Sequence, residues 1–499
     1  MNISMVSDRR KEMFMYIPVL DSDSASSLYM QLYEGLKQDL ISGLVPAGTR
    51  LSSKRLLASA LGVSVNTVDS AYQQLVSEGY LEAHAKSGYF VCDLGEYISR
   101  AEASAAAYSD SGTGISADTD HEAGRKPSVI DFSPNGVDLS ALPLLKIKKT
   151  IRDVFETAGV EAFAGCDPQG AEVLRNALCK YLRESRGLIC SQEQIILGAG
   201  TDYILQLLVQ ILRSMQNVTT VAMENPVYNK AYQIFTGLQV PVELIPLDKS
   251  GIHMGSLSAS RSNIVYTTPS HQFPLGIIMP VNRRTELLAW ASAAPGRYII
   301  EDDYDSEFRY AGRPIPAISG LDAQNTVIYL GTFSKSIAPS VRISYLVVPP
   351  DLLKAYRKNL SYYNTTINHP DQLILAKFIN SGDFERHINR MRTTYRRKRD
   401  LFVQALAPYK DKLQISGTDA GLHLLCHVKN GMSEEELVGN AKNAATKVYG
   451  ISSYYLFDKA GIRPCLSVAP KSTVLLGYAS LTEEQIIEGV SALARAWQL

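Results

Sequence analysis

The feature that most constrains the fold is Lys335, which lies between two apolar runs in TVIYLGTFSKSIAPSVRISYLVV. The run from Thr326 to Leu330 predicts a buried strand, and we expect Gly331 and the polar residues after it to end that strand. Arg342 is expected to open a second apolar strand a few residues after the lysine. The pattern therefore indicates an α/β sheet with a lysine just beyond the end of a strand.

The position of this lysine predicts a reactive amine. A lysine beyond a buried strand can be desolvated, which lowers its pKa and leaves a neutral amine that forms Schiff bases. The hydroxyls of Thr332 and Ser334 and the guanidinium of Arg342 would suit a phosphate group beside that amine. A surface lysine in a polar turn is the plain alternative on this segment alone.

A second apolar run, in RYIIEDDYDSEF, ends in Glu301, Asp302 and Asp303. Carboxylates at the end of a parallel strand point into the crevice where α/β sheets bind ligands. A carboxylate against a pyridine nitrogen would keep that nitrogen protonated and hold the ring as an electron sink. The carboxylates thus favour the reactive lysine over the surface lysine.

These stretches resemble the fold type I pyridoxal-phosphate enzymes of the aspartate aminotransferase class. The resemblance implies that Asp302 binds the pyridine nitrogen and Tyr304 the phenolic oxygen of pyridoxal 5'-phosphate. It also implies that Lys335 holds this cofactor as an internal aldimine. Arg342 matches the family's phosphate-binding arginine.

Other residues join this predicted cofactor site. Gly200 and Thr201 follow a strand and open a helix, whose N-terminus offers backbone N–H groups to a phosphate. Tyr228 in MENPVYN lies where an aromatic side chain of the family stacks on the pyridine ring, although an isolated tyrosine is more often plain packing. In YTTPSHQFPLG, His271 or Gln272 lies nearest the phenolic oxygen in place of the family's asparagine, or the histidine is a structural part of the turn.

The pattern from residue 129 to residue 499 is globular throughout. Strand-like runs alternate with helical stretches, which predicts a mostly parallel sheet covered on both faces. After about residue 351 the pattern turns helical, and GLHLLCHV and STVLLGYA follow as strands. We therefore expect an α/β, fold type I aminotransferase-like domain over residues 129–499, with a smaller α+β C-terminal subdomain from about residue 352.

The N-terminal part has a different pattern. Tyr29, Leu32, Leu36 and Leu40 fall at helical spacing, and LSSKRLLASALGVSVNTVDSAYQQLVSEGYLEAHAKSGYFV follows. Serine caps predict two further helices, joined by a tight turn at the LGVS stretch. YLEAHAKSGYFV predicts a two-stranded wing. The whole indicates a winged helix-turn-helix over residues 27–93.

This segment resembles the DNA-binding domain of GntR-type regulators, on the LGVS turn, the NTV helix start, the AYQQL core and the EGYL step. The resemblance places the second helix of the motif in the major groove. It implies six DNA contacts, from Ser64, Asn66 and Thr67 to bases or phosphates, from Lys54 and Arg55 to the backbone, and from Lys86 in the wing to the minor groove. Val65 and Ser52 stand where the family usually has arginine and proline, so base specificity is less firmly predicted than DNA binding.

Residues 94–128 are rich in Ala, Ser, Asp and Gly and predict a flexible linker. A linker of this length would let the predicted DNA-binding domain reach a partner subunit.

Acidic and basic residues balance at 50 each, so net charge does not point to nucleic acid. The 6 cysteines show none of the paired spacings that bind metals, so no metal site is predicted. In a chain of this length they are typical of the reduced thiols of a cytoplasmic protein. No apolar run approaches the length of a membrane span.

The two halves together resemble the MocR/GabR family of bacterial transcription regulators. The resemblance implies operator DNA as one partner, a head-to-tail homodimer, and a small amine or amino-acid effector that forms an external aldimine and frees Lys335. Lys230 and Ser453 stand where the GABA-responsive regulator has arginines, so a bidentate grip on an effector carboxylate is not expected.

Two other functions stay open at this point. The residues for transamination are present, so an active pyridoxal-phosphate-dependent aminotransferase is one alternative. VLLGYASL carries no arginine near the place where ordinary aminotransferases hold the substrate carboxylate, which favours the regulator. The other alternative is a regulator that senses pyridoxal phosphate itself.

Overall fold

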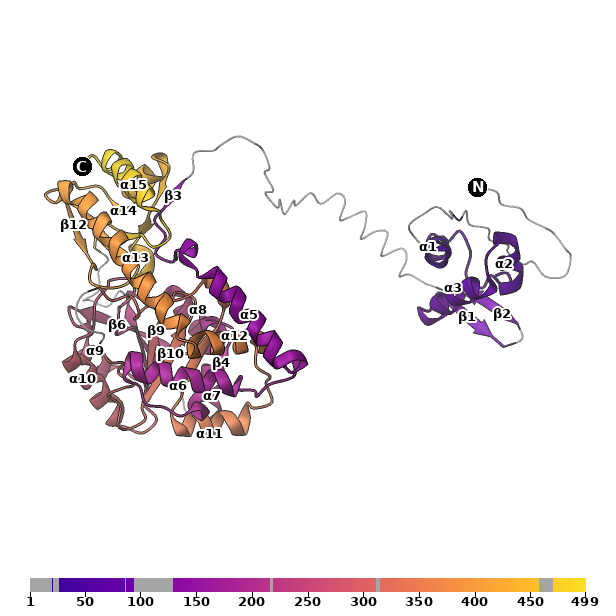
Figure 1. Cartoon of the computed structure of the whole chain (residues 1–499), viewed down its shortest axis with the longest axis horizontal. Helices are drawn as coiled ribbons and strands as arrows, with labels where there is room; N and C mark the ends of the chain where they lie inside the picture. Colours follow the sequence, from indigo (N-terminus) through magenta and orange to yellow (C-terminus); the bar gives the residue numbers. More distant parts are fainter. Residues whose placement is uncertain are drawn as a thin grey trace. The chain divides into compact units, whose positions relative to one another are not determined.

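The computed structural model describes residues 20, 27–85, 87–93, 129–215, 219–310, 315–456 and 470–499. The chain divides into two compact units, Met1–Ala123 and Gly124–Leu499 (Figure 1). The predicted linker at residues 94–128 lies outside the described residues, and so does Lys86 in the predicted wing.

The first unit is a helix-turn-helix followed by a wing. Its described elements are α1 (Leu28–Ile41), α2 (Lys54–Leu61), α3 (Val65–Ser77), β1 (Leu81–His84) and β2 (Gly88–Val91). Ser27, Ser53 and Ser64 precede the helices, and the side-chain oxygen of each accepts a backbone N–H from the first turn. Gly62 takes a left-handed conformation with φ of 65°, which turns the chain between α2 and α3.

An apolar core holds these elements together. Leucines of α1 pack against Val68, Tyr72 and Leu75 of α3, and all of these side chains are buried. The two wing strands pair antiparallel, with Leu81 opposite Val91. The predicted winged helix-turn-helix is therefore confirmed.

The second unit is built on an eight-stranded sheet with the order β4-β11-β10-β9-β8-β5-β6-β7. The strands are β4 (Ile195–Gly198), β5 (Val221–Asn225), β6 (Val242–Asp248), β7 (Gly251–Ile252), β8 (Ile264–Thr267), β9 (Tyr298–Asp303), β10 (Val327–Thr332) and β11 (Ser344–Val347). The five strands from β10 to β6 in this order run parallel, whereas β11 is antiparallel to both of its neighbours. The sheet is mostly parallel, as predicted.

Helices cover both faces of this sheet. On one face α7 (Thr201–Ser214), α8 (Asn229–Gly237) and α11 (Pro350–Asn359) share an apolar cluster with Ile328 and Leu330 of β10. The other face is covered by α6 (Glu172–Arg186), α9 (Met254–Ala259), α10 (Val281–Ser292) and α12 (His369–Asn380). This arrangement buries the central strands on both sides, which is why their sequences are continuously apolar.

A smaller four-stranded sheet follows, with the order β12-β13-β16-β15. Its strands are β12 (Leu413–Ser416), β13 (His423–Val428), β15 (Tyr449–Gly450) and β16 (Thr473–Gly477). It packs with α13 (Asp383–Leu406), α14 (Glu434–Asn443) and α15 (Glu483–Ala496). In Figure 1, α13 (orange) runs from beside the large sheet to the smaller one.

The remaining elements are short, apart from one helix. They are β3 (Ile130–Asp131), which pairs with β14 (Thr446–Lys447), the helix α5 (Leu144–Ala158), and the 3-10 turns η1 (Leu139–Ala141), η2 (Gly159–Phe163), η3 (Gln192–Gln194), η4 (Pro339–Val341), η5 (Ala407–Tyr409) and η6 (Ser452–Tyr454). Within the described ranges, none of the helices combines the length and apolarity needed to cross a membrane.

Two predicted boundaries are wrong. β10 does not end at Leu330 but continues to Thr332, because β11 lies alongside and pairs with it. A Cβ atom at Gly331 would collide with the Tyr345 ring on β11. This glycine therefore allows the close approach of the tyrosine and does not end the strand. Arg342 does not open the next strand either: it is left-handed, with φ of 48°, and β11 begins at Ser344.

The predicted start of the smaller subdomain near residue 352 is too early. Leu352 and Tyr356 of α11 and Leu375 of α12 are buried in the apolar clusters on the large sheet. The chain leaves that sheet along α13, and the separate four-stranded sheet begins only with β12. Helical pattern alone does not tell which sheet a helix covers.

Candidate cofactor and DNA-binding sites

The predicted cofactor residues come from the carboxyl ends of neighbouring parallel strands. β9 and β10 pair in register, so that Asp302 lies opposite Leu330 and Asp303 opposite Gly331. Lys335 follows the end of β10, and Tyr304 follows the end of β9. Ends of parallel strands meet at one edge of a sheet, which is where α/β folds bind their ligands.

Lys335 is only partly exposed, and its Nζ lies 3.4 Å from the carbonyl oxygen of Pro134 and 3.4 Å from Oδ1 of Asn135. Burial lowers the pKa of the Lys335 ammonium group to about 8, although the nearby Asp305 carboxylate opposes this shift. A larger fraction of this side chain than of an ordinary lysine is therefore a neutral amine near neutral pH. Pro134 and Asn135, which precede the sheet by many residues, were not anticipated from the sequence.

Asp302 is buried and accepts a hydrogen bond from the Tyr266 hydroxyl. Burial raises the pKa of Asp302 to about 7, and the Tyr266 hydrogen bond only partly offsets that effect. No cationic side chain among the described residues forms an ion pair with Asp302. A protonated ring nitrogen would supply the positive partner that this buried carboxylate needs.

The side chain of Tyr304 joins a buried polar network with His271 and Asp305. The Tyr304 hydroxyl donates to the carbonyl oxygen of His271 at 2.9 Å and lies 3.0 Å from its Nδ1. That same Nδ1 is 2.9 Å from Oδ2 of Asp305. Within the described residues, His271 Nε2 and Asp305 Oδ1 are buried without a hydrogen-bond partner. The network therefore has unused polar atoms, and the charge of its Asp305 acts on the amine of Lys335.

Gln272 takes a different role from His271. Its Nε2 donates to the carbonyl oxygens of Pro226 at 2.9 Å and Phe273 at 2.8 Å, and its Oε1 accepts from the backbone of Leu275. These bonds hold the turn after β8. Of the two residues that the sequence left open, His271 is the one in contact with Tyr304.

The groups that are predicted to bind a phosphate lie together at the start of α7. Gly200 has φ of 84°, and a Cβ there would collide with the guanidinium of Arg342, so the glycine lets the arginine reach the helix N-terminus. Thr201 is the first residue of α7. The Arg342 side chain is half exposed and lies 3.1 Å from Asp202. A helix N-terminus with an arginine beside it would suit a phosphate group.

Thr332 and Ser334, whose hydroxyls are also predicted to suit the phosphate, contact each other. The Thr332 hydroxyl donates to the Ser334 hydroxyl at 3.2 Å, and Ser344 donates to Thr332 at 2.9 Å.

Tyr228, the predicted stacking residue, immediately precedes α8 and packs edge-on against Phe273. Burial raises the pKa of Tyr228 to about 12, and the next cause is the charge of Asp302. Tyr228 and Asp302 are therefore neighbours.

The two predicted effector residues lie at the junction of the large and small sheets. Lys230 is exposed in the first turn of α8, and Ser453 is exposed in η6. The neighbouring Asn229 donates to the backbone oxygen of Ser453 at 2.8 Å, and the backbone of Val227 donates to Tyr454 at 3.1 Å. The start of α8 is thus tied to η6, although no contact joins the side chains of Lys230 and Ser453.

Two buried groups near the strand ends were missed by the sequence analysis. Glu224 of β5 accepts from Thr267 at 2.5 Å and from Thr268, and burial raises its pKa to about 7. Arg186 of α6 lies 2.7 Å from Asp303 with both side chains buried. A glutamate directly before Asn-Pro at a strand end was the available signal for Glu224.

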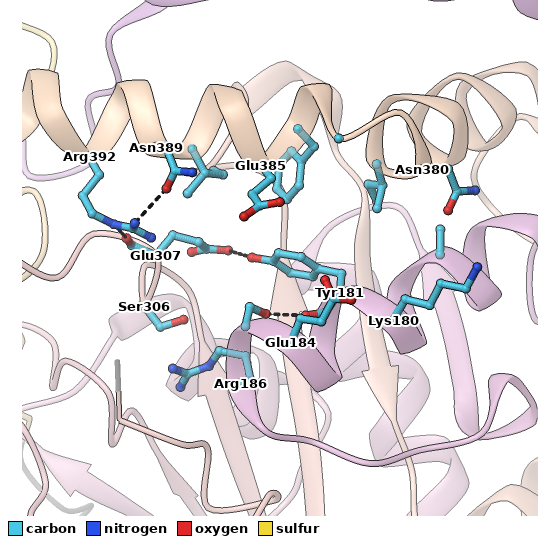
Figure 2. A pocket seen from close by; sticks show the side chains of 16 residues that line it. Lys180, Tyr181, Glu184, Arg186, Ser306, Glu307, Asn380, Glu385, Asn389 and Arg392 are labelled. Atoms are coloured by element: carbon cyan, nitrogen blue, oxygen red, sulfur yellow. Dashed lines mark hydrogen bonds between the residues drawn. The ribbon is translucent and has the colours of Figure 1, made fainter. Parts of the chain in front are cut away.

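A cavity of about 490 Å³ lies between α6, the segment after β9 and the corner of α12 and α13. Figure 2 shows Tyr181 of α6 bonded to Glu307, a contact of 2.9 Å, below Glu385 and Arg392 of α13. Arg392 donates to the carbonyl oxygen of Glu307 at 2.9 Å. Lys335 does not line this cavity, so it is separate from the predicted cofactor site.

The predicted DNA contacts of the first unit lie at the start of α3. Ser64 and Asn66 are exposed, and the Ser64 oxygen caps α3 by accepting from the backbone of Thr67 at 3.0 Å. Arg55 is exposed on α2. Lys54, which is predicted to contact the DNA backbone, forms an ion pair with Asp69 at 2.7 Å.

Comparison with known proteins decides the family. Residues 28–91 match the model of bacterial regulatory proteins of the gntR family, and residues 127–493 match that of aminotransferase class I and II. The HTH-type transcriptional regulator YdeL of Bacillus subtilis is 38% identical over 97% of this chain and 99% of its own length. The probable rhizopine catabolism regulatory protein MocR of Rhizobium meliloti is 32% identical over 96% of this chain and 95% of its own length.

The chain belongs to the MocR/GabR family of GntR-type transcription regulators. The solved structure of Pyrococcus horikoshii kynurenine aminotransferase with PMP is similar to the second unit, with a TM-score of 0.63 and 26% identity over 75% of this chain and 91% of that one. The predicted fold class is therefore confirmed.

The residues of this MocR/GabR-type regulator fit pyridoxal phosphate, the cofactor that its aminotransferase class I and II domain implies. When bound, pyridoxal phosphate supplies an electron-accepting ring and an aldehyde that condenses reversibly with primary amines. The partly neutral amine of Lys335 would meet the aldehyde, and the unpaired Asp302 carboxylate would meet the ring nitrogen. The guanidinium of Arg342 beside Gly200 would meet the phosphate.

The raised carboxyl pKa values predict a pH-dependent stability. Between about pH 4 and pH 7 folded Glu224 keeps its proton, whereas the unfolded chain releases it, so stability falls as pH rises through this window. We expect Glu224→Gln to remove roughly 3 kcal/mol of this pH dependence in the cofactor-free protein. Urea unfolding at pH 5 and pH 8 measures it, with Glu184→Gln, exposed on α6, as the control. An unchanged pH dependence in Glu224→Gln would contradict the assignment of a neutral Glu224.

Proposed function

We propose that this protein is a transcription regulator that binds operator DNA through α3 and senses a small primary amine or amino acid at the Lys335 site. The observation that carries the proposal is the half-buried Lys335 amine, with its pKa lowered to about 8, at the same sheet edge as the unpaired Asp302. An effector amine is the same kind of nucleophile as Lys335, so binding of the effector is expected to release the Lys335 side chain.

Effector binding is expected to affect DNA binding by shifting the equilibrium between two conformations of the protein. The effector changes DNA affinity only by its differential affinity for these conformations. The contact of Asn229 with Ser453 supports a coupling between the large sheet and the small one, because both are adjacent to the predicted site. Lys230 offers the effector a point charge and Ser453 a hydroxyl, which favours ligands that do not need a bidentate carboxylate grip.

A homodimer is part of this proposal, with a head-to-tail arrangement. α5 and η2 expose an apolar surface formed by Leu144, Leu145, Phe155, Val160 and Phe163, of which Leu145 is 83% exposed and Val160 82% exposed. Exposed apolar side chains gathered along one helix and the turn after it are typical of protein–protein contacts. It supports a partner subunit on this face of the second unit.

DNA reading is expected to depend on Asn66. Its side chain is exposed at the start of α3, where a helix in the major groove reaches base edges. Replacing Asn66 by alanine should lower affinity for duplexes selected from a random library by about 5- to 150-fold, which corresponds to roughly 1–3 kcal/mol. Fluorescence anisotropy with labelled duplexes measures this change in DNA affinity.

The matched control is Asn443→Ala, an exposed asparagine at the end of α14. It should leave DNA affinity unchanged, and binding of Asn66→Ala to unselected duplexes should also persist because that binding depends on phosphates. Equal affinity of Asn66→Ala and wild type for the selected duplexes would overturn the role of α3.

The whole function is tested by titrating cofactor-loaded protein on its selected DNA with glycine, β-alanine and a diamine, with trimethylamine as the control. We expect a primary amine to change DNA affinity by about 5- to 150-fold and to change the cofactor's absorption, while trimethylamine does neither. Steady keto-acid formation with no effect on DNA would favour the aminotransferase instead. A DNA response to pyridoxal phosphate alone would favour a sensor of the cofactor.

A further inference from the structure

Two cysteines lie side by side away from the cofactor site. Cys179 is in α6, and Cys190 is in the segment after that helix. The two sulfur atoms are 3.8 Å apart, and the Cys190 thiol donates to the Cys179 sulfur. Both residues are partly exposed, so small reagents in solvent can reach them. Their spacing along the chain matches no CxxC motif, so this contact could not be predicted from the sequence.

The chain around Cys190 can adjust. α6 ends at Arg186, Gly187 turns the chain with φ of 66°, and no regular element forms until η3 at Gln192. Ile189, directly before Cys190, is 81% exposed and so imposes little packing constraint. A disulfide has sulfur atoms about 2.05 Å apart, so the segment would need to move by only ~2 Å.

The surroundings make the two thiols unequal. The hydrogen bond from Cys190 lowers the pKa of Cys179, with Arg183 and Arg175 acting in the same direction and burial and Glu193 opposing it. The pKa of Cys190 is raised, first by its bond to Cys179 and then by burial. Cys179 is therefore the more acidic thiol of the pair, and Cys190 the less acidic one.

We propose that Cys179 and Cys190 are a site of reversible oxidation, at which a hydroperoxide converts the two thiols into an intramolecular disulfide. The Cys179 thiolate attacks one peroxide oxygen, the O–O bond breaks, and Cys179 becomes a sulfenic acid. Cys190 sulfur then attacks the Cys179 sulfur, the S–O bond breaks, and water leaves with the Cys190 proton. For hydrogen peroxide, the two thiols lose two electrons and the peroxide is reduced to two waters.

The crosslink would join α6 to the segment that leads into β4. α6 also carries Arg186, which pairs with Asp303 next to Asp302, while β4 ends before the Gly200 turn. In the oxidised protein, two elements that border the predicted cofactor site would thus be joined covalently. Because a crosslink restricts the unfolded chain, we expect a higher melting temperature after oxidation, reversed by dithiothreitol.

The test uses the full-length, cofactor-loaded protein treated with hydrogen peroxide, then alkylated and digested without reduction. Mass spectrometry should find a linked Cys179–Cys190 peptide that dithiothreitol removes, while Cys166, a partly exposed cysteine outside the pair, remains alkylated. Cys179→Ser and Cys190→Ser should each abolish the linked peptide, and Cys166→Ser should keep it. The wild-type measurement stands even if a variant folds poorly.

Other results would overturn the site. One is full alkylation of both thiols after peroxide, at the same rate as Cys166. A second is a linked peptide that joins either residue to a different cysteine or to another chain. A third is conversion of Cys179 to sulfinic acid without any linked peptide, because that shows that Cys190 does not reach it.

Discussion

Lys335→Ala is expected to abolish covalent capture of pyridoxal phosphate. The variant removes the primary amine at this edge whose pKa burial lowers to about 8, while Asp302 and Arg342 remain to hold the cofactor by ionic contacts. Dialysis should therefore strip the cofactor from Lys335→Ala but not from wild type, and the absorption of bound cofactor should disappear. DNA binding should persist, because α3 belongs to the other unit.

The matched control is Lys354→Ala, which removes an exposed lysine of α11. It should keep the cofactor through dialysis. Retention of the wild-type absorption spectrum by Lys335→Ala would contradict the assignment, because another amine would then hold the aldehyde.

Arg186→Met is expected to give the largest loss of stability. The Arg186 side chain is 5% exposed and that of Asp303 1% exposed, and their atoms lie 2.7 Å apart. Arg186 also donates to Ser270 at 2.6 Å and to the carbonyl oxygen of Ile315 at 2.9 Å. Removing one partner of a buried pair leaves an uncompensated charge, so unfolding of the second unit should become easier by about 3–5 kcal/mol.

Urea unfolding measures this loss, and Arg183→Met is the control from the same helix. Arg183 is exposed, so its replacement should change stability by no more than about 0.5 kcal/mol. If Arg186→Met unfolds at the same urea concentration as Arg183→Met, the pair does not stabilise the strand end that carries Asp302.

Local signals explain how much of the first unit was predictable. Ser53 and Ser64 cap their helices by hydrogen bonds within the same turn, and Gly62 supplies the left-handed residue between them. These effects act over three or four residues, so the sequence contains them completely. The winged helix-turn-helix followed from them together with the buried stripe of α3.

The second unit was predictable in its order of strands and helices but not in its long-range contacts. Leu330 was taken as the end of a strand because a glycine follows, whereas β11, reached after a turn, extends the pairing to Thr332. The contact of Lys335 with Pro134 joins residues that are 201 positions apart in the sequence. No local sequence pattern indicates such a contact. Periodicity reports which face of an element is buried, but not which element covers it.

The candidate site shows the same division. Asp302, Tyr304 and Lys335 follow apolar runs, so their place at the strand ends could be predicted. The choice between His271 and Gln272 could not be made from the sequence, because it depends on Asp305 and Tyr304 approaching the turn after β8. The pair of Cys179 and Cys190 likewise depends on how the chain turns at Gly187.

Borohydride treatment of the purified wild-type protein, followed by mass spectrometry of the modified peptide, shows directly whether Lys335 is the amine that holds the cofactor. We expect a single reduced pyridoxal-phosphate adduct on Lys335 and no adduct on exposed lysines such as Lys230. An adduct elsewhere, or none at all in protein that carries the cofactor's absorption, would contradict this assignment.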